Sequence, residues 1–392
     1  MSLNDLRDKF AIVGASMTKL SRKNPEMSTM GFALEACKKA IEDAGLQKDD
    51  VDGLLLAYPS QQGERHGFSG RVADLLGISS NFNATVDCGG ATPIVTVQMA
   101  TMAVNAGMCK AVVCCYGWQN NPIDVPLGLP PGFEFTLPFG EIAATPFLAQ
   151  VTRRHMHDFG TTSRQLGTVA VTCRKHASLN PNAQMHGKPI TLEDHQNSRW
   201  ISEPLRALDC CPWTDGGGAV VITSAERAKD LRKSPVYISG WGQAHGAPLM
   251  RPWRNPQIPD WNTWTRSGDA AFAMAGVTRK DINVCQLYDA FTIVFLLQLE
   301  ISGLCKTGES GPFVEAGNIA LGGHLPCNTA GGLLSEGHTM GLGHIVEAVR
   351  QLRGECGDRQ VKNAEVALVT GFGGVVNEYP PSFSHSTLIL RR

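Results

Sequence analysis

AGLQKDDVDGLLL (44–56) is matched in pattern by AGVTRKDINVCQL (275–287). Each stretch has a small residue followed by glycine, a polar break that contains Lys-Asp, and then a hydrophobic segment typical of a buried strand. Two matching stretches so far apart indicate that the chain contains an internal repeat.

A second correspondence follows the first in the same order. The segments 90–107 and 337–354 both begin and end with glycine, and each precedes a hydrophobic strand, at 110–116 and 364–371 respectively. Between these matches, hydrophobic runs alternate with segments of helical periodicity, which favours mostly parallel sheets flanked by helices. The sequence therefore predicts a duplicated α/β unit with a pseudo-two-fold axis.

We place the two halves at residues 1–240 and 241–392. Within the first half, the segment 117–210 is too long for a simple connection and is predicted to be an insertion with its own helices. Insertions above an α/β core commonly form the lid and walls of a ligand site.

Three tryptophans lie in the stretch RPWRNPQIPDWNTWT (251–265): Trp253, Trp261 and Trp264. We expect this stretch to be an irregular loop, whose aromatic rings serve packing or contact a large apolar ligand.

The composition excludes several classes of protein. The 392 residues include 35 Lys and Arg against 36 Asp and Glu, a net charge of −1 that gives no general attraction to nucleic acid or membrane surfaces. Neither a membrane-spanning apolar run nor a signal-peptide pattern is found, so we expect a cytoplasmic protein. The 12 cysteines include no C-x-x-C pair, so we expect reduced thiols and no metal site.

In a duplicated α/β unit, reactive groups are expected where strands turn into helices, because helix N-termini present free N–H groups. Three turns qualify: VDCGGATPIV (86–95), NTAGGLLSEGHTMGLGHIVEA (328–348) and the glycine-rich TGFGGVV (370–376). QLYDAF (286–291) adds a tyrosine and an aspartate at the end of the repeated strand.

The ordered set of motifs DGGGAVVITSAERA (215–228), YDAF (288–291), NTAGGLLSEGH (328–338) and GFGG (371–374) resembles the thiolase superfamily, most closely its sterol-carrier-protein-x type. The resemblance extends over essentially the whole chain. It implies the thiolase fold, in which two duplicated α/β halves form a five-layer αβαβα sandwich with a lid-like insertion.

The chain departs from a working thiolase at the positions that carry the chemistry. Thiolases place a nucleophilic cysteine 17 residues before the glycine that ends the central helix, where this chain has Gly90; Cys88 lies two residues too early. The position of the second catalytic cysteine is Gly371, and Tyr288 replaces the asparagine of a further motif. Only the motif histidine remains, as His338.

Without a cysteine at either position the chain lacks the two thiols with which thiolases form and resolve an acyl-enzyme. The resemblance still implies an acyl-CoA cleft. It implies that backbone amides at Gly90, Gly373 and Gly374 bind substrate or an oxyanion, and that His324 lies at the coenzyme A entrance. These parts suit a retro-aldol cleavage of a bulky β-hydroxyacyl-CoA, which needs no cofactor.

The resemblance is closest to bacterial steroid side-chain aldolases, which convert a 17-hydroxy steroid-22-oyl-CoA to a 17-ketosteroid and propanoyl-CoA. It implies that Tyr288 and His338 are the catalytic pair. Actinobacterial members have a second tyrosine at the position of His338, so the assignment of base and acid stays open. Free pKa values of about 6.5 for histidine and about 10 for tyrosine favour His338 as the base and Tyr288 as the acid.

The same resemblance implies a homodimer and a small partner protein with a zinc ribbon and an OB-fold, together forming a heterotetramer. Two other functions stay open: an acyltransferase that uses Cys88 as its nucleophile, and a non-catalytic lipid carrier or scaffold subunit. Structural roles are also alternatives for Tyr288, His338 and His324. For Asp289 we expect a structural role, either capping a helix or forming a salt bridge near the dimer surface.

Overall fold

The computed structural model describes residues 3–59, 66–119, 137–141, 143–246, 262–375 and 382–392. The predicted alternation of strands and helices is confirmed in both halves. The first half contains β1 (Phe10–Met17), α1 (Thr29–Ala44), β2 (Gly53–Ala57), α2 (Phe68–Leu76), β3 (Phe82–Val86), α3 (Thr92–Asn105), β4 (Ala111–Trp118), β7 (Gly216–Ser224) and α8 (Ala225–Ala228). The second contains β8 (Val236–His245), α9 (Asn262–Ala275), β9 (Val284–Gln286), α10 (Thr292–Ile301), α11 (Ser310–Glu315), α12 (Gly332–Ser335), α13 (Leu342–Arg353), β10 (Val366–Val375) and β11 (Ser382–Arg391).

The strand order shows the duplication directly. The strands run β3-β2-β4-β7-β1-β8-β11-β10-β9, so β2, β4, β7 and β1 of the first half mirror β9, β10, β11 and β8 of the second. The prediction of mostly parallel pairing is wrong, because five of the eight strand pairs described in this sheet are antiparallel. The halves meet where β1 pairs with β8, at Ala11 with Tyr237 and Ile12 with Val236. The division between residues 240 and 241 stays a prediction, and both residues lie within β8.

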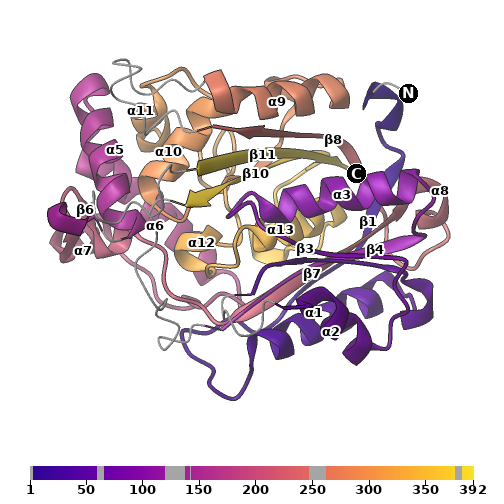
Figure 1. Ribbon diagram of the computed structural model, residues 1–392. Coiled ribbons are helices and arrows are strands. Elements are labelled where there is room, and N and C mark those ends of the chain that lie inside the picture. The colour runs from indigo at the N-terminus through magenta and orange to yellow at the C-terminus, as the bar shows by residue number, and fades with distance from the viewer. Residues whose placement is uncertain (1–2, 60–65, 120–136, 142, 247–261, 376–381) are drawn as a thin grey trace.

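Figure 1 shows five layers, from α9 at the top through β8, β11 and β10, then α3 and α13, then the sheet of the first half, to α1 and α2 at the bottom. Contacts agree, since α3 and α13 touch strands of both halves whereas α1 packs on β1, β4 and β7. The middle helices, α3 and α13, lie between the strands of the first half and those of the second. A helix in that position is apolar around most of its circumference, as α3 is.

Local signals place the ends of these elements. The side chain of Ser28 accepts a hydrogen bond from the Gly31 N–H at the start of α1, and Gly45 ends the helix with a φ of 73°. A left-handed residue at this position favours glycine. The start of α3 brings Gly90 to the centre of the molecule, between the two sheets.

The insertion has helices of its own, as predicted. It comprises α5 (Ala144–Phe159), α6 (Ser163–Ser178), α7 (Leu192–Asn197) and a short hairpin of β5 (Trp200–Ser202) and β6 (Leu205–Arg206). In Figure 1 these elements lie at the left, beyond the ends of the strands and beside α10, α11 and α12. The helix α6 contacts all three, so the insertion packs against the turns that carry the candidate site.

One prediction about the second half is wrong. Trp264 does not lie in an irregular loop but in α9, with its side chain completely buried in the core. Proline and glycine near this stretch obscured the helical periodicity. Trp253 and Trp261 lie outside the described residues.

Two further findings concern composition. All 12 cysteines are free thiols, as predicted. In the described part of the chain, no helix combines the length and the apolar character needed to cross a bilayer.

Candidate active site

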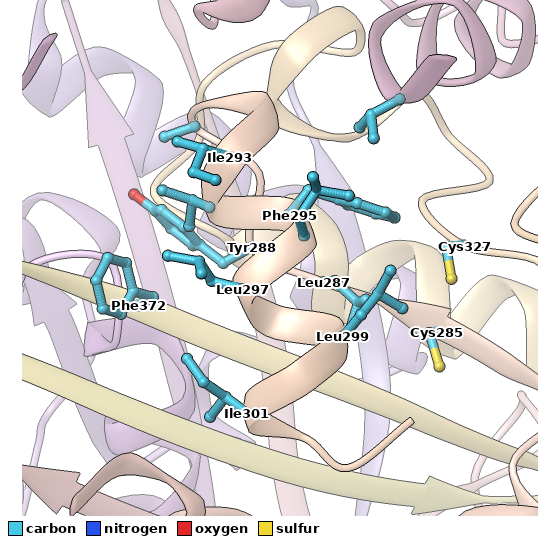
Figure 2. Close-up of a cluster of buried hydrophobic side chains, with 14 of the residues drawn as sticks. Cys285, Leu287, Tyr288, Ile293, Phe295, Leu297, Leu299, Ile301, Cys327 and Phe372 are labelled. Atoms are coloured by element: carbon cyan, nitrogen blue, oxygen red, sulfur yellow. The ribbon is translucent and has the colours of Figure 1, made fainter. Parts of the chain in front are cut away.

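Tyr288 stands between β9 and α10, where the repeated strand ends. Its backbone N–H donates to Oγ1 of Thr370 at 3.1 Å, and its ring meets Phe372 edge-on with 6.4 Å between centroids. Figure 2 shows the ring beside α10, with the hydroxyl pointing away from Leu287 and Leu299. Burial is the main cause that raises the pKa of Tyr288, and the nearby charges of Cys211 and Asp289 add to it. The phenol therefore stays protonated at neutral pH.

Gly90 lies against this ring. A Cβ atom built on Gly90 would overlap the Tyr288 ring and the carbonyl oxygen of Phe372. The Tyr288 ring therefore occupies the volume that a side chain at position 90 would enter. Glycine is required here by space, because no other residue leaves that volume free.

The glycines of β10 are equally close to the start of α3. A Cβ on Gly373 would overlap the backbone nitrogen of Gly90. A Cβ on Gly371 would lie 2.6 Å from Oγ of Ser386 and 2.8 Å from the Gly90 carbonyl oxygen, too close for a real contact. Gly374 continues the strand, paired with Phe383. Neither position 90 nor position 371 has room for a cysteine in this arrangement.

His338 follows α12 and is half-buried. Its backbone N–H donates to Oγ1 of Thr214 at 2.9 Å, and the Thr214 hydroxyl donates to Oε1 of Gln184 at 2.8 Å. Burial lowers the pKa of His338 to about 4, so the imidazole is neutral at neutral pH and one ring nitrogen is free to accept a proton. The sequence offered no sign that Thr214 and Gln184 hold this segment.

A cavity of about 620 Å³ opens beside His338. Its walls come mainly from the insertion, α12 and the segment that precedes β7, and they are largely apolar. Cys211 lines the cavity and also lies close enough to Tyr288 to influence its pKa. His338 lines the cavity and Tyr288 does not, and the described contacts bring Tyr288 close to Cys211 but not to His338.

The cavity wall is also positively charged. Arg22, Arg174 and Arg199 line it, and among the described lining residues none is acidic. Arg174 is only 8% exposed; its guanidinium donates to Oγ of Ser335 and to the carbonyl oxygen of Lys188, both at 3.1 Å, rather than to a carboxylate. A buried cation without a counter-ion is costly, so the wall suits an anionic ligand.

Cys88 is not directed at this region. Its thiol accepts a hydrogen bond from Nε2 of Gln243 on β8 at 3.7 Å, and it does not line the cavity. Burial raises the pKa of Cys88, with a further contribution from the negative charge of Asp87. A nucleophilic cysteine has the opposite shift.

His324 is exposed on the loop after α11 and does not line the cavity, so its role at the coenzyme A entrance stays a prediction. Asp289 has a structural role, as expected. Its carboxylate accepts from the N–H groups of Leu333 and Leu334 at the start of α12, at 2.8 and 3.4 Å, and lies 3.1 Å from Nε2 of His344. These bonds place α12, and with it the His338 segment.

Comparison with known proteins agrees with this geometry. A family model described as thiolase C-terminal domain-like matches residues 253–392. A steroid side-chain-cleaving aldolase of Thermomonospora curvata is 40% identical over 380 residues, which cover 93% of this chain and 95% of that protein. The chain belongs to the thiolase superfamily.

Within the superfamily, other relatives include both lyases and thiolases. A 17-hydroxy-3-oxo-4-pregnene-20-carboxyl-CoA lyase of Mycobacterium tuberculosis is 40% identical over 386 residues, with 94% of this chain and 98% of that protein covered. The solved Ltp2-ChsH2(DUF35) aldolase superposes with a TM-score of 0.88 at 39% identity, covering 98% of both chains. Human mitochondrial 3-ketoacyl-CoA thiolase shares the fold, with a TM-score of 0.69 at 14% identity and coverage of 98% and 99%.

These findings confirm the predicted thiolase fold and the predicted relationship to steroid side-chain aldolases. This thiolase-superfamily member is an enzyme of the aldolase-type lyase class. The roles of its individual residues stay predictions.

Proposed function

We propose that this enzyme cleaves the Cα–Cβ bond of a bulky β-hydroxyacyl-CoA by a retro-aldol reaction, without a covalent acyl-enzyme. The observation that carries the proposal is the Tyr288 ring in the volume where a nucleophilic thiol at position 90 would stand. The site thus has a phenol in place of a thiol. A protonated phenol acts as a proton donor rather than as a nucleophile.

The reaction balances within the substrate. The proton of the β-hydroxyl passes to His338, the Cα–Cβ bond breaks as the ketone forms, and the bond's electron pair moves to the thioester oxygen as an enolate. Cα then takes a proton from Tyr288, and water returns a proton from His338 to Tyr288. The products are a ketone and a shortened acyl-CoA.

The protonation states support these roles. Burial keeps the Tyr288 phenol protonated and His338 neutral at neutral pH, which are the states required of an acid and a base. Backbone amides at Gly90, Gly373 and Gly374 are the proposed donors to the developing oxyanion, where losing one donor typically costs about 10²–10³-fold in rate.

As the substrate we propose a 17-hydroxy steroid-22-oyl-CoA, which would yield a 17-ketosteroid and propanoyl-CoA. The names of the two relatives that are 40% identical support a steroid thioester. The largely apolar cavity suits a steroid or pantetheine chain, and Arg174, with Arg22 and Arg199, suits the anionic groups of coenzyme A.

We further propose a cytoplasmic assembly of a homodimer with a small zinc-ribbon and OB-fold partner. The similarity to the Ltp2-ChsH2(DUF35) aldolase supports the partner. The edge strand β3, whose outer side pairs with no strand among the described residues, is the proposed dimer contact.

The test is turnover of this thioester by the purified protein, alone and with such a partner, followed by mass spectrometry of both products. We expect the ketosteroid and propanoyl-CoA in equal amounts. Tyr288→Phe should lower kcat by about 10²–10⁴-fold, as expected for a lost general acid.

Cys88→Ala is the matched control and should keep full activity. Loss of activity in this variant, or an acyl group trapped on Cys88, would instead support an acyltransferase. Tight acyl-CoA binding without turnover would support a carrier.

A further inference from the structure

His344 lies in the first turn of α13, the central helix of the second half, and its side chain is 1% exposed. Its Nε2 atom lies 2.8 Å from the carbonyl oxygen of Leu287 and 3.1 Å from Oδ1 of Asp289. Both partners are acceptors, so Nε2 carries the hydrogen and donates to them. The two acceptors belong to the residues directly before and after Tyr288.

Other side chains hold this segment at one residue only. The side chain of Asn328 brackets Leu287, accepting from its N–H at 2.7 Å and donating to its carbonyl oxygen at 2.8 Å. Thr370 accepts from the N–H of Tyr288. Among the described residues, His344 is the one side chain that bonds on both sides of Tyr288.

The start of α13 also meets the ring of Tyr288. A Cβ atom built on Gly341, the residue that begins the helix with a φ of 92°, would lie 3.4 Å from Cδ2 of Tyr288 and 3.5 Å from the Gly90 carbonyl oxygen. The hydroxyl of Tyr288 itself forms no hydrogen bond with a described residue. Its direction is therefore set by the packing of the ring and by the backbone that carries it.

We propose that His344 is a positioning residue, whose hydrogen bonds to Leu287 and Asp289 aim the Tyr288 phenol at one face of the enolate. Cα then takes its proton from one side only. His344 acts through the backbone and does not touch the substrate. This inference rests on the proposed retro-aldol function.

The test is the configuration of the product formed in D2O. The phenol exchanges to O–D, so the wild type should release propanoyl-CoA with deuterium at C2 as a single enantiomer. NMR of a chiral ester of the freed propanoate gives the enantiomer ratio. This ratio does not depend on how much of a variant is folded, so a loss of stability alone leaves it unchanged.

Two variants differ only in reach. A glutamine amide nitrogen can take the place of Nε2, whereas an asparagine amide is one methylene shorter. We expect His344→Asn to lower kcat by about 10²-fold with little change in KM, as for a reacting group misplaced by about 1 Å, and to give both enantiomers. His344→Gln should restore most of kcat and the single enantiomer. His344→Leu, which has no donor, should give the same mixture as His344→Asn.

His155→Leu is the matched control. His155 lies in the insertion and is 2% exposed, with Nε2 3.2 Å from Oε1 of Glu300, so this variant also removes a buried histidine–carboxylate pair. We expect a lower melting temperature, as for His344→Leu, but a single enantiomer.

A single enantiomer from both His344→Asn and His344→Leu, a mixture from His344→Gln, or a mixture from His155→Leu would each overturn the inference. A wild type that itself gives both enantiomers would overturn it too, while leaving the cleavage established. A wild type that releases no propanoyl-CoA would instead overturn the proposed function.

Discussion

At the scale of single residues, this protein differs from a thiolase at positions 90 and 288: the tyrosine ring at position 288 occupies the volume that a cysteine side chain at position 90 would need. Gly90 leaves open a volume, and the Tyr288 ring fills it. The two positions are therefore coupled sterically. A cysteine restored at position 90 would meet the ring before it met a substrate.

Gly90→Ala should lower the free energy of unfolding by about 1–3 kcal/mol, because its Cβ overpacks against the ring of Tyr288. Adding Tyr288→Ala should relieve part of this cost. A double-mutant cycle in denaturant should then give a coupling energy of about 0.5–3 kcal/mol.

Tyr288→Phe is the control for this cycle, because it keeps the ring and should give no relief. Gly90→Ala with wild-type stability would contradict the steric account.

His338 determines the expected pH dependence. Its pKa in the folded protein is about 4, below the usual value, so protonation removes the base only in strong acid. We expect kcat/KM to be constant from pH 8 to well below pH 6 and to fall only as the pH approaches 4. Far-UV circular dichroism at each pH would confirm that the protein stays folded.

An acidic limb centred near pH 6.5, the ordinary histidine value, would contradict this prediction. His338→Gln should keep only residual activity and lose the limb.

At the scale of elements, the short helix α12 depends on a carboxylate from another turn. Asp289 accepts hydrogen bonds from the first N–H groups of α12 and contacts His344 in α13. One buried aspartate thereby positions two helices and the His338 segment between them.

Asp289→Asn should lower the free energy of unfolding by about 2–3 kcal/mol, because its amide group presents a donor where only acceptors fit. Activity should fall as well, since α12 carries the His338 segment. Denaturant unfolding measures the first effect and turnover the second.

Asp269→Asn serves as the control, because Asp269 pairs with Arg279 at the surface, where its side chain is 63% exposed. Its change in stability should be within about 1 kcal/mol. Equal effects of the two variants would contradict the role given to Asp289.

At the scale of the whole molecule, Arg353 ties the two halves together. It lies at the end of α13 with its side chain 2% exposed, and it binds Oδ2 of Asp43 at 2.9 Å and the carbonyl oxygen of Val13 at 2.8 Å. Both partners belong to the first half. The contact therefore links the second central helix to α1 and β1.

Arg353→Met should destabilise the protein by about 2–3 kcal/mol, since it removes the buried hydrogen bonds to Asp43 and to the Val13 carbonyl oxygen and leaves Asp43 only Lys233 at 3.5 Å. Arg153→Met provides the comparison, because the Arg153–Glu203 pair is more than 60% exposed on both sides and should contribute less than about 1 kcal/mol. Thermal unfolding of both variants decides the point; no difference between them would contradict the link.

The sequence by itself determined the order of the elements, the duplication, and the absence of the two thiolase cysteines at positions 90 and 371. Helix ends at glycines and hydrophobic periodicity are local properties, readable within a few turns of chain. Where local signals conflicted, the prediction was wrong, as for Trp264, whose helix begins just after a proline-rich stretch.

Only the tertiary structure decided which side chain occupies the space beside position 90. Tyr288 is nearly two hundred residues from Gly90 in the sequence. The contact between them results from packing two halves against shared central helices, and the fold likewise brings together the three arginines that line the cavity. Such contacts join residues that are far apart in the sequence, so no local sequence pattern indicates them.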